Sequence, residues 1–174
     1  MNKYDASDIQ VLEGLEPVRL RPGMYIGGTD EKAWHHLPVE IMDNSIDEAV
    51  AGFAKKIVVN LIDSKTIEIT DDGRGIPVDE HPKYPGKSAL EVILTTLHSG
   101  GKFNNNVYKT SGGLHGVGSA VVNALSSRMD VVISRDGYEW SQSFSRGKAL
   151  GPIVQGNATK NHGTKIKFAL DDEI

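Results

Sequence analysis

Four glycines occur within seven residues, at positions 112, 113, 116 and 118 of the run TSGGLHGVGSAVVNAL. Glycine has no Cβ, so a backbone rich in it can bring its N–H groups close to a ligand, most often an anion. The residues that follow, VGSAVVNALS, have the composition of a helix. We therefore expect a glycine-rich loop that leads into a helix N-terminus, where unpaired N–H groups collect.

Two common nucleotide-binding loops do not fit this chain. The segment PGKSAL is similar to the end of a P-loop, but that motif needs a glycine five residues before Gly86, where the chain has His81. The dinucleotide pattern G-x-G-x-x-G also fails, because Gly113, Gly116 and Gly118 are spaced as G-x-x-G-x-G. The sequence thus disfavours the P-loop nucleotide-binding fold and a nicotinamide-dependent oxidoreductase.

Composition limits the protein class further. The chain has 174 residues, enough for one domain with its own core. Its net charge is −4 without a block of like charges, so strong binding of nucleic acid by this chain alone is not expected. The absence of cysteine excludes disulfides and zinc–thiolate sites and fits a cytoplasmic location. No apolar run has the length of a membrane span, so no membrane partner is expected.

Hydrophobic periodicity and turn residues predict an α+β fold, with helices packed on one face of a mixed β-sheet. Helices are predicted at 8–15 (capped by Ser7), 34–53, 88–98 (capped by Ser88) and 117–126. Strands are predicted at 56–62 and 66–70 as a hairpin, over 128–147 as a second hairpin that turns at Asp136-Gly137, and at 163–170. The segments 19–30 and 99–113 are predicted to be loops.

The predicted helix 34–53 carries a cluster of acidic residues. At about 100° per residue, one side holds Glu40, Asp43, Asn44, Asp47 and Glu48, and the other holds Val39, Met42, Ile46, Ala49, Val50 and Phe53. A solvated face usually mixes lysine with glutamate, but no Lys or Arg occurs between Lys32 and Lys55. The acidic face is therefore either solvated surface or a site that a hard cation such as Mg²⁺ completes.

The motif DDGRGIP forms a second candidate site, directly after a predicted strand. Asp71 at the strand end could point into a pocket and accept a hydrogen bond from an exocyclic amine, which adenine has and a keto base lacks at that position. Arg74 and Pro77 would then form walls of the pocket. The alternative is a simple glycine turn that ends the strand.

Taken in order, these motifs resemble the GHKL ATPases, the gyrase, Hsp90, histidine-kinase and MutL superfamily that shares the Bergerat ATP-binding fold. The order is an Asn/Glu helix, D-x-G-x-G, G-x-x-G-x-G and a late G-T. Longer strings, among them LEGLEPVRLRPGMYIG, DNSIDEAVAG, DDGRGIPV and LHSGGKF, resemble the B subunit of bacterial type IIA topoisomerases along nearly the whole chain. GGTDEKAWHHL, HPKYPGKSALEVI and FSRG are more similar to the topoisomerase IV B subunit (ParE) than to gyrase B.

The resemblance implies a role for each matching residue. Glu40 would be the general base, His36 would orient the attacking water, and Asn44 would bind Mg²⁺. Asp71 would read adenine with Thr164, and Glu48 and Arg74 would pair at the pocket mouth near Arg135. The remaining implied residues are Gly75, Ile76 and Pro77 beside adenine; Gly100, Gly101, Lys102 and Tyr108 in the ATP lid; Leu114, His115, Gly116, Val117 and Gly118 around the β,γ-phosphates; and Tyr4 and Ile9 in an arm that crosses to a second copy of the chain.

The implied domain is a single GHKL ATPase domain over 1–174, with a dimerisation arm at 1–15 and the lid and phosphate loop at 99–118. The transducer and later domains of the topoisomerase are expected to lie outside this chain. The implied function is binding and hydrolysis of ATP with Mg²⁺, which drives dimerisation of two B subunits for DNA strand passage. The implied partners are a second B subunit, a ParC-like A subunit, DNA in the full enzyme and inhibitors of the adenine site.

Three alternatives remain beside this interpretation. The chain could be the ATPase domain of gyrase B, or an ATP-gated dimerisation clamp in which hydrolysis is incidental. A histidine kinase shares the fold, but it would need a phospho-acceptor domain and lacks the GGLHGVG form of the loop.

Overall fold

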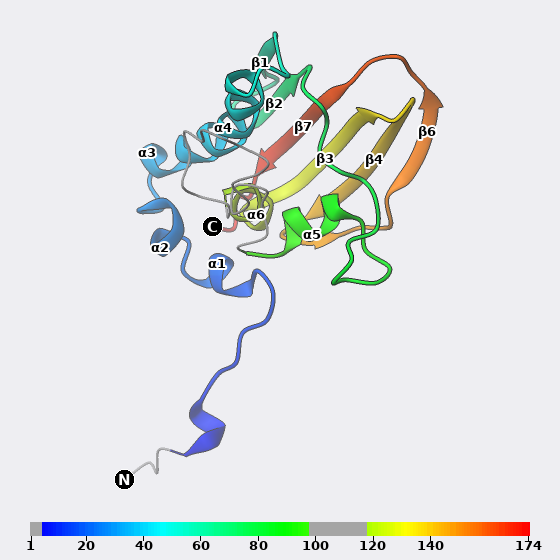
Figure 1. Cartoon of the computed structure of the whole chain (residues 1–174). Coiled ribbons are helices and arrows are strands. Elements are labelled where there is room, and N and C mark those ends of the chain that lie inside the picture. Colours follow the sequence, from blue (N-terminus) through cyan, green and yellow to red (C-terminus); the bar gives the residue numbers. More distant parts are fainter. Residues whose placement is uncertain (1–4, 98–117) are drawn as a thin grey trace.

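A computed structural model describes residues 5–97 and 118–174 of the chain (Figure 1). The helices are η1 (Ala6–Asp8), α1 (Glu16–Leu20), α2 (Gly23–Ile26), α3 (Glu31–Trp34), α4 (His36–Val50), α5 (Ala89–Thr95) and α6 (Gly118–Ala124). The strands are β1 (Ile57–Leu61), β2 (Thr66–Asp71), β3 (Ser126–Arg135), β4 (Tyr138–Ser145), β5 (Lys148–Ala149), β6 (Val154–Ala158) and β7 (Gly163–Leu170). None of the helices within these described ranges is long and apolar enough to cross a membrane.

The strands form one sheet in the order β1-β2-β7-β3-β4-β5, with β6 paired to β4. The predicted hairpins are confirmed, and the β3–β4 turn has positive φ at both Asp136 and Gly137, as a type I′ turn requires. The α+β class is confirmed, but the expectation of a mixed sheet is wrong. All pairings between described strands are antiparallel, because β7 enters between β2 and β3 and runs opposite to both.

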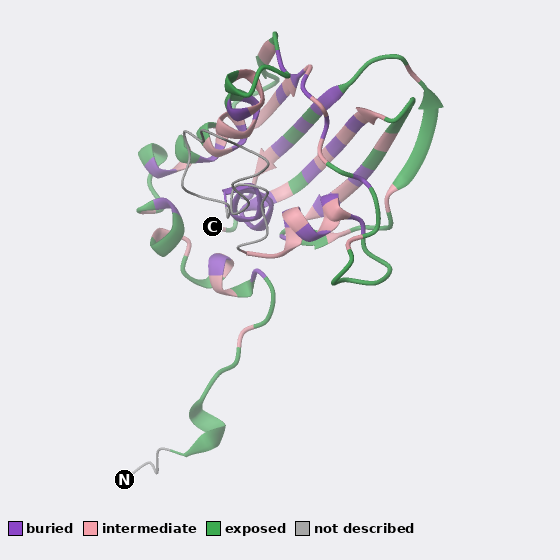
Figure 2. Ribbon diagram, in the orientation of Figure 1, coloured by how far each residue is buried: buried purple, intermediate pink, exposed green. Residues whose placement is uncertain are grey.

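The long helices cover one face of the sheet, and the core lies between these two layers (Figure 1). Residues of β7 alternate between buried Ile166 and Phe168 and exposed Lys165 and Lys167, as expected for a sheet with one solvated face. Figure 2 shows α6 buried along its length between the other helices and the sheet, and every residue of α6 is buried. This helix therefore lies entirely within the core.

Helix α4 turns its polar side toward the protein. Its buried stripe is Leu37, Ile41 and Ser45, and Asp47 is also buried. The apolar side of the predicted helix is largely exposed to solvent, with four of its six residues exposed: Val39, Ile46, Val50 and Phe53. A helical wheel shows two sides, but it does not show which one the sheet covers. Here Leu37 and Ile41 fix the orientation, and the acidic side chains lie at the edge of that stripe.

The N-terminal segment differs from the prediction. The expected helix at 8–15 is absent from the structure; instead Asp5, not Ser7, caps the short η1, and the chain then runs extended away from the body (Figure 1). The predicted loop at 19–30 contains parts of α1 and α2. Both helices are short, five and four residues, and helices of this length give no clear periodicity in sequence.

An ion cluster around a buried carboxylate ties α1 to the end of α6. Arg19 donates to the carbonyl oxygen of Ala124 at 2.7 Å and pairs with Asp171 at 2.8 Å, and Arg146 pairs with the same carboxylate at 2.9 Å. Burial acts to raise the pKa of Asp171. The hydrogen bonds from the Glu173 N–H and Arg19, with the charges of both arginines, outweigh burial and hold this pKa below its ordinary value. Asp171 is therefore a charged, paired residue of the interior.

Candidate nucleotide site

Asp71 is the last residue of β2, and its side chain is buried against α4. The Ser45 hydroxyl donates to Asp71 Oδ2 at 2.6 Å, and the Gly73 N–H donates to Oδ1 at 2.9 Å. Burial raises the pKa of Asp71 and the Glu48 charge adds to this, while the bonds from Ser45 and Gly73 oppose it. All of these donors are neutral and a carboxylate offers about four lone-pair positions, so Asp71 retains acceptor capacity for a ligand.

Glycines allow the chain to pass close to Asp71. A Cβ at Gly73 would lie 2.8 Å from Glu48 Oε2 and 2.9 Å from Asp71 Oδ1. A Cβ at Gly163 would overlap the carbonyl oxygen of Asp71, and its φ of +141° is one that other residues rarely adopt. Gly163 precedes Thr164, which is buried and pairs in register with Asp71 across β2 and β7. The two strands thus bring Thr164 beside the carboxylate.

Glu48 and Arg74 form the ion pair that the resemblance implies. Arg74 donates through Nη2 to Glu48 Oε1 at 2.6 Å, and through Nε at 3.1 Å and its backbone N–H at 2.9 Å to Oε2. The Arg74 guanidinium also lies 3.9 Å from the centre of the Phe53 ring, a cation–π contact. One arginine therefore joins the end of α4 to the turn after β2.

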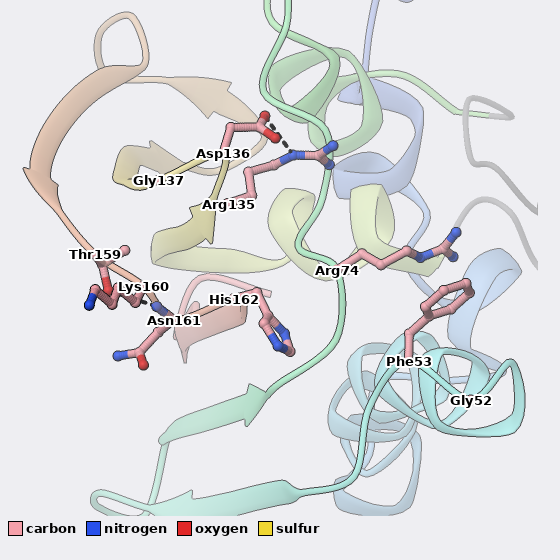
Figure 3. A pocket seen from close by; sticks show the side chains of 10 residues that line it. All are labelled: Gly52, Phe53, Arg74, Arg135, Asp136, Gly137, Thr159, Lys160, Asn161 and His162. Atoms are coloured by element: carbon pink, nitrogen blue, oxygen red, sulfur yellow. Dashed lines mark hydrogen bonds and ion pairs between the residues drawn. The ribbon is translucent and has the colours of Figure 1, made fainter.

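A pocket of ≈ 750 Å³ opens beside this ion pair (Figure 3). Phe53 and Arg74 lie on one side of the view, Arg135 and Asp136 come from the β3–β4 turn, and His162 lies between them. Arg135 Nη1 donates to the Gly75 carbonyl at 2.9 Å. The lining includes Arg74 but not Asp71, so this pocket does not contain the Asp71 carboxylate. Ile76 donates to Thr164 Oγ1 at 3.3 Å, whereas Pro77 is exposed.

Helices α4 and α6 meet at the other end of the site. Asn44 donates through Nδ2 to Ser119 Oγ at 2.6 Å. Gly118 lies so close to Glu40 that a Cβ there would overlap the carboxylate. His36 is exposed and begins α4, one turn before Glu40. The helix predicted over 34–53 thus begins at residue 36, and α4 places Glu40, Asn44 and Glu48 along one line.

The residues around Asn44 fit Mg²⁺ bound together with phosphate. Within residues 5–97 and 118–174 no group of three or more His, Cys, Asp or Glu could hold a metal ion by itself. Mg²⁺ often has few protein ligands, with phosphate oxygens and water completing its shell. The Asn44 amide nitrogen is occupied by Ser119, so the amide oxygen is the end suited to a cation. The described residues at this end of the site therefore do not enclose a metal ion with protein ligands alone.

The structure describes only part of the predicted site. Tyr4, Gly100, Gly101, Lys102, Tyr108, Leu114, His115, Gly116 and Val117 lie outside the described residues, while Ile9 of the arm is exposed. Two residues that contact the site were missed from sequence, Ser45 and Ser119, whereas Gly73 and Gly163 belong to the D-x-G-x-G and G-T motifs but were given no role there. The serines directly follow predicted site residues, Asn44 and Gly118, but nothing in a sequence shows that their hydroxyl groups point inward.

Comparison with known proteins places the chain among related ATPases. Residues 29–174 match the family described as histidine kinase-, DNA gyrase B-, and HSP90-like ATPase. The chain is 66% identical over 172 residues to the B subunit of DNA topoisomerase 4 from Caulobacter vibrioides, covering 99% of this chain and 25% of the relative. It is 53% identical over 174 residues to the B subunit of DNA gyrase from Thermotoga maritima, covering 100% of this chain and 27% of the relative.

A solved structure is similar in fold. It is the 43K ATPase domain of Thermus thermophilus gyrase B in complex with an aminocoumarin, with a TM-score of 0.78 and 43% identity over 92% of this chain and 40% of that chain. The chain spans about a quarter of the length of the curated relatives it matches.

Proposed function

The chain belongs to the family of histidine kinase-, DNA gyrase B- and HSP90-like ATPases, and we propose that it binds ATP with Mg²⁺ and hydrolyses it. The observation that carries this proposal is Asp71, a buried carboxylate held by neutral donors at the end of β2. Two oxygens fixed in this way suit a ligand that offers an amine. Thr164 beside Asp71 adds a hydroxyl that can bind the same base directly or through water.

The reacting end would be formed by α4 and the start of α6. Glu40 would accept the proton of the attacking water, and His36, one turn earlier, would orient that water. Asn44 would hold Mg²⁺ through its amide oxygen, and the ion would neutralise charge on the phosphates. The glycine-rich loop that leads into Gly118, and Lys102 in the proposed lid, would supply further contacts to the phosphates.

For the whole protein we propose the B subunit of a DNA topoisomerase IV. The identity to the B subunit of DNA topoisomerase 4 over nearly the whole chain supports this assignment over gyrase B, to which the identity is lower. ATP binding would join two B subunits through the segment 1–15, with Tyr4 and Ile9 reaching the second copy. A ParC-like A subunit and DNA would complete the enzyme in the cytoplasm, and molecules that imitate adenine would inhibit it.

Base selection tests this proposal directly. Isothermal calorimetry with ATP and GTP should give a Kd for GTP at least 10-fold higher, because the keto oxygen of guanine would face the Asp71 carboxylate. An unsatisfied hydrogen bond to a charged group costs about 1.5–3 kcal/mol. CTP, which carries an amine on a smaller ring, controls for size. Equal affinities for ATP and GTP would rule out Asp71 as the base-reading residue.

Hydrolysis tests the role of Glu40 separately. Glu40→Ala should lower the rate of ATP turnover by about 10²–10⁴-fold, the usual contribution of a general base, and change the Kd for ATP by no more than a few-fold. Phosphate release and calorimetry measure the two quantities. Turnover at the parent rate would show that Glu40 is only a solvated residue of α4. Dimerisation by ATP in this variant would show that nucleotide binding without hydrolysis joins two copies, and its absence would favour a simple hydrolase.

A further inference from the structure

Ser119 contacts the residue that we assign to the metal. It is the second residue of α6, it is 7% exposed, and its Oγ accepts a hydrogen bond from Asn44 Nδ2 at 2.6 Å. Ser119 and Asn44 come from different helices, 75 residues apart in the chain. The bond therefore links the helix that carries Glu40 to the helix that follows the glycine-rich loop.

An asparagine side chain has two chemically different ends. Its oxygen can bind a cation, whereas its NH₂ group is a donor that a cation repels. The two ends exchange places when the amide rotates by half a turn, so a free asparagine can present the wrong one. Ser119 accepts from the nitrogen in this structure, which leaves the oxygen as the end available to a cation.

We propose that Ser119 is a positioning residue that selects the oxygen end of Asn44 for Mg²⁺. This inference rests on the proposed function, because it assumes that Mg²⁺ binds at Asn44 together with ATP. Ser119 does not touch the cation and acts through Asn44. Loss of its hydroxyl should therefore change the Mg²⁺ dependence of ATP binding and leave Mg²⁺-free binding unchanged.

The experiment is calorimetric titration of the 174-residue chain with ATP at a series of Mg²⁺ concentrations and in EDTA. Ser119→Ala should raise the Mg²⁺ concentration for half-maximal ATP affinity about 2- to 10-fold, the range of one neutral hydrogen bond. The Kd for ATP in EDTA should stay within about 1.5-fold of the parent, since no hydrogen bond to the nucleotide is lost. Ser119→Thr keeps a hydroxyl and should restore the parent Mg²⁺ dependence.

A second variant separates amide selection from packing between the helices. Asn44→Asp has oxygen at both ends, so selection is no longer needed. In this background the Ser119 hydroxyl can donate to either carboxylate oxygen but no longer selects an end, so Ser119→Ala should shift the Mg²⁺ dependence less than in the parent, whereas a packing role for Ser119 would give the same shift in both backgrounds. Ser119→Cys has similar volume and a weak acceptor, and it should shift the Mg²⁺ dependence in the same direction as alanine if the alanine variant fails to fold.

The outcomes distinguish this inference from the function on which it rests. An unchanged Mg²⁺ dependence in both Ser119→Ala and Ser119→Cys, with normal ATP binding, would overturn the inference alone. An equal loss of affinity in EDTA and in Mg²⁺ would also overturn it, because the hydroxyl would then act on the nucleotide or the fold. A parent chain that binds no ATP in either condition would overturn the proposed function and the inference together.

Discussion

Two buried aspartates lie near opposite ends of β7, and their surroundings are opposite. Asp71 is paired in register with Thr164 at the start of the strand, and Asp171 follows its last residue. Their exposed fractions are 7% and 3%. Asp71 accepts from a hydroxyl and a backbone N–H, whereas Asp171 lies between Arg19 and Arg146. Consequently the pKa of Asp71 is raised and that of Asp171 is lowered.

The difference separates the residue that we propose for ligand binding from a structural one. The charge of a buried carboxylate between two arginines is compensated, so the group stabilises the fold and retains little capacity to bind a ligand. A buried carboxylate with neutral donors alone is costly to ionise, and a ligand that brings a donor relieves this cost. Burial by itself does not distinguish the two, but the charge of the neighbours does.

The largest effect is expected for stability at Asp171. Asp171→Asn leaves Arg19 and Arg146 without their shared anion and should lower the free energy of unfolding by about 3 kcal/mol. We take the lower end of the range for broken buried pairs because the Arg146 side chain is 44% exposed. Urea denaturation measures this change. A loss below about 1 kcal/mol would show that the cluster is not structural, and ATP affinity should stay within about two-fold.

At Asp71 we expect a large effect on ATP affinity and a small effect on stability. Asp71→Asn should weaken ATP binding about 10- to 150-fold, which corresponds to about 1.5–3 kcal/mol for a hydrogen bond to a charged group. Its effect on the free energy of unfolding should be smaller than that of Asp171→Asn, because no buried cation is left unpaired. Calorimetry and urea denaturation of the same preparation give both values. If Asp71→Asn strongly lowered the free energy of unfolding but left the Kd for ATP unchanged, Asp71 would be a structural residue and not the binding residue that we propose.

The pH dependence of stability should have opposite signs at the two sites. The stabilisation by Asp171 is present above its ordinary pKa of 3.8 and is lost as pH falls through the lowered folded pKa. Asp71 has the opposite sign. Its folded pKa is raised, so at pH values between the ordinary and the raised pKa the folded chain holds a proton that the unfolded chain has released. Its contribution is full below the ordinary pKa of 3.8 and is lost as pH rises through the raised value.

Urea denaturation between about pH 3 and pH 7 checks these signs. The stability difference between the parent and Asp171→Asn should shrink toward low pH, and that between the parent and Asp71→Asn should shift in favour of the variant toward high pH. Parallel curves for the parent and Asp71→Asn would show that Asp71 titrates normally. ATP binding should weaken as Asp71 becomes protonated.

The smallest effects are expected within the arginine pair. Arg19→Gln should cost about 1.5–2 kcal/mol, because its 22%-exposed side chain bonds both Asp171 and the Ala124 carbonyl. Arg146→Gln should cost about 0.5–1 kcal/mol, since its charge is closer to solvent. Thermal or urea unfolding of the two variants makes this comparison. Equal costs would mean that the bond to the end of α6 contributes nothing.

Much of the fold could be predicted from sequence because its signals are local. The hairpin turn at Asp136-Gly137 needs positive φ at two residues, and Ser88 caps α5 through its bond to Glu91. The direction of β7 between β2 and β3 depends on tertiary contacts, so the prediction of a mixed sheet failed. The orientation of α4 could not be predicted for the same reason, since both of its sides carry enough apolar residues to be buried.

The sequence located the buried carboxylate of Asp71 at the end of β2, and the resemblance implied the pair of Glu48 and Arg74, which the structure shows; the role of Asp71 toward a ligand stays a prediction. It was incomplete where one side chain meets another from a distant segment. Ser45 reaches Asp71 and Ser119 reaches Asn44 through hydroxyl groups whose directions depend on how α4, α6 and β2 pack. Gly163 is required because another strand passes at contact distance, which only a structure can show.

Because Arg19 attaches α1 to the body, the chain that precedes α1 has a limited reach. The segment before it leaves the body at Leu15, which is buried, and Ile9 lies six residues earlier with 60% of its surface exposed. Six extended residues reach roughly 20 Å. Any surface that Ile9 contacts on a second copy must therefore pass within roughly 20 Å of Leu15. If Ile9 contacts a second copy, the length of the N-terminal segment thus limits how far that copy can lie from Leu15.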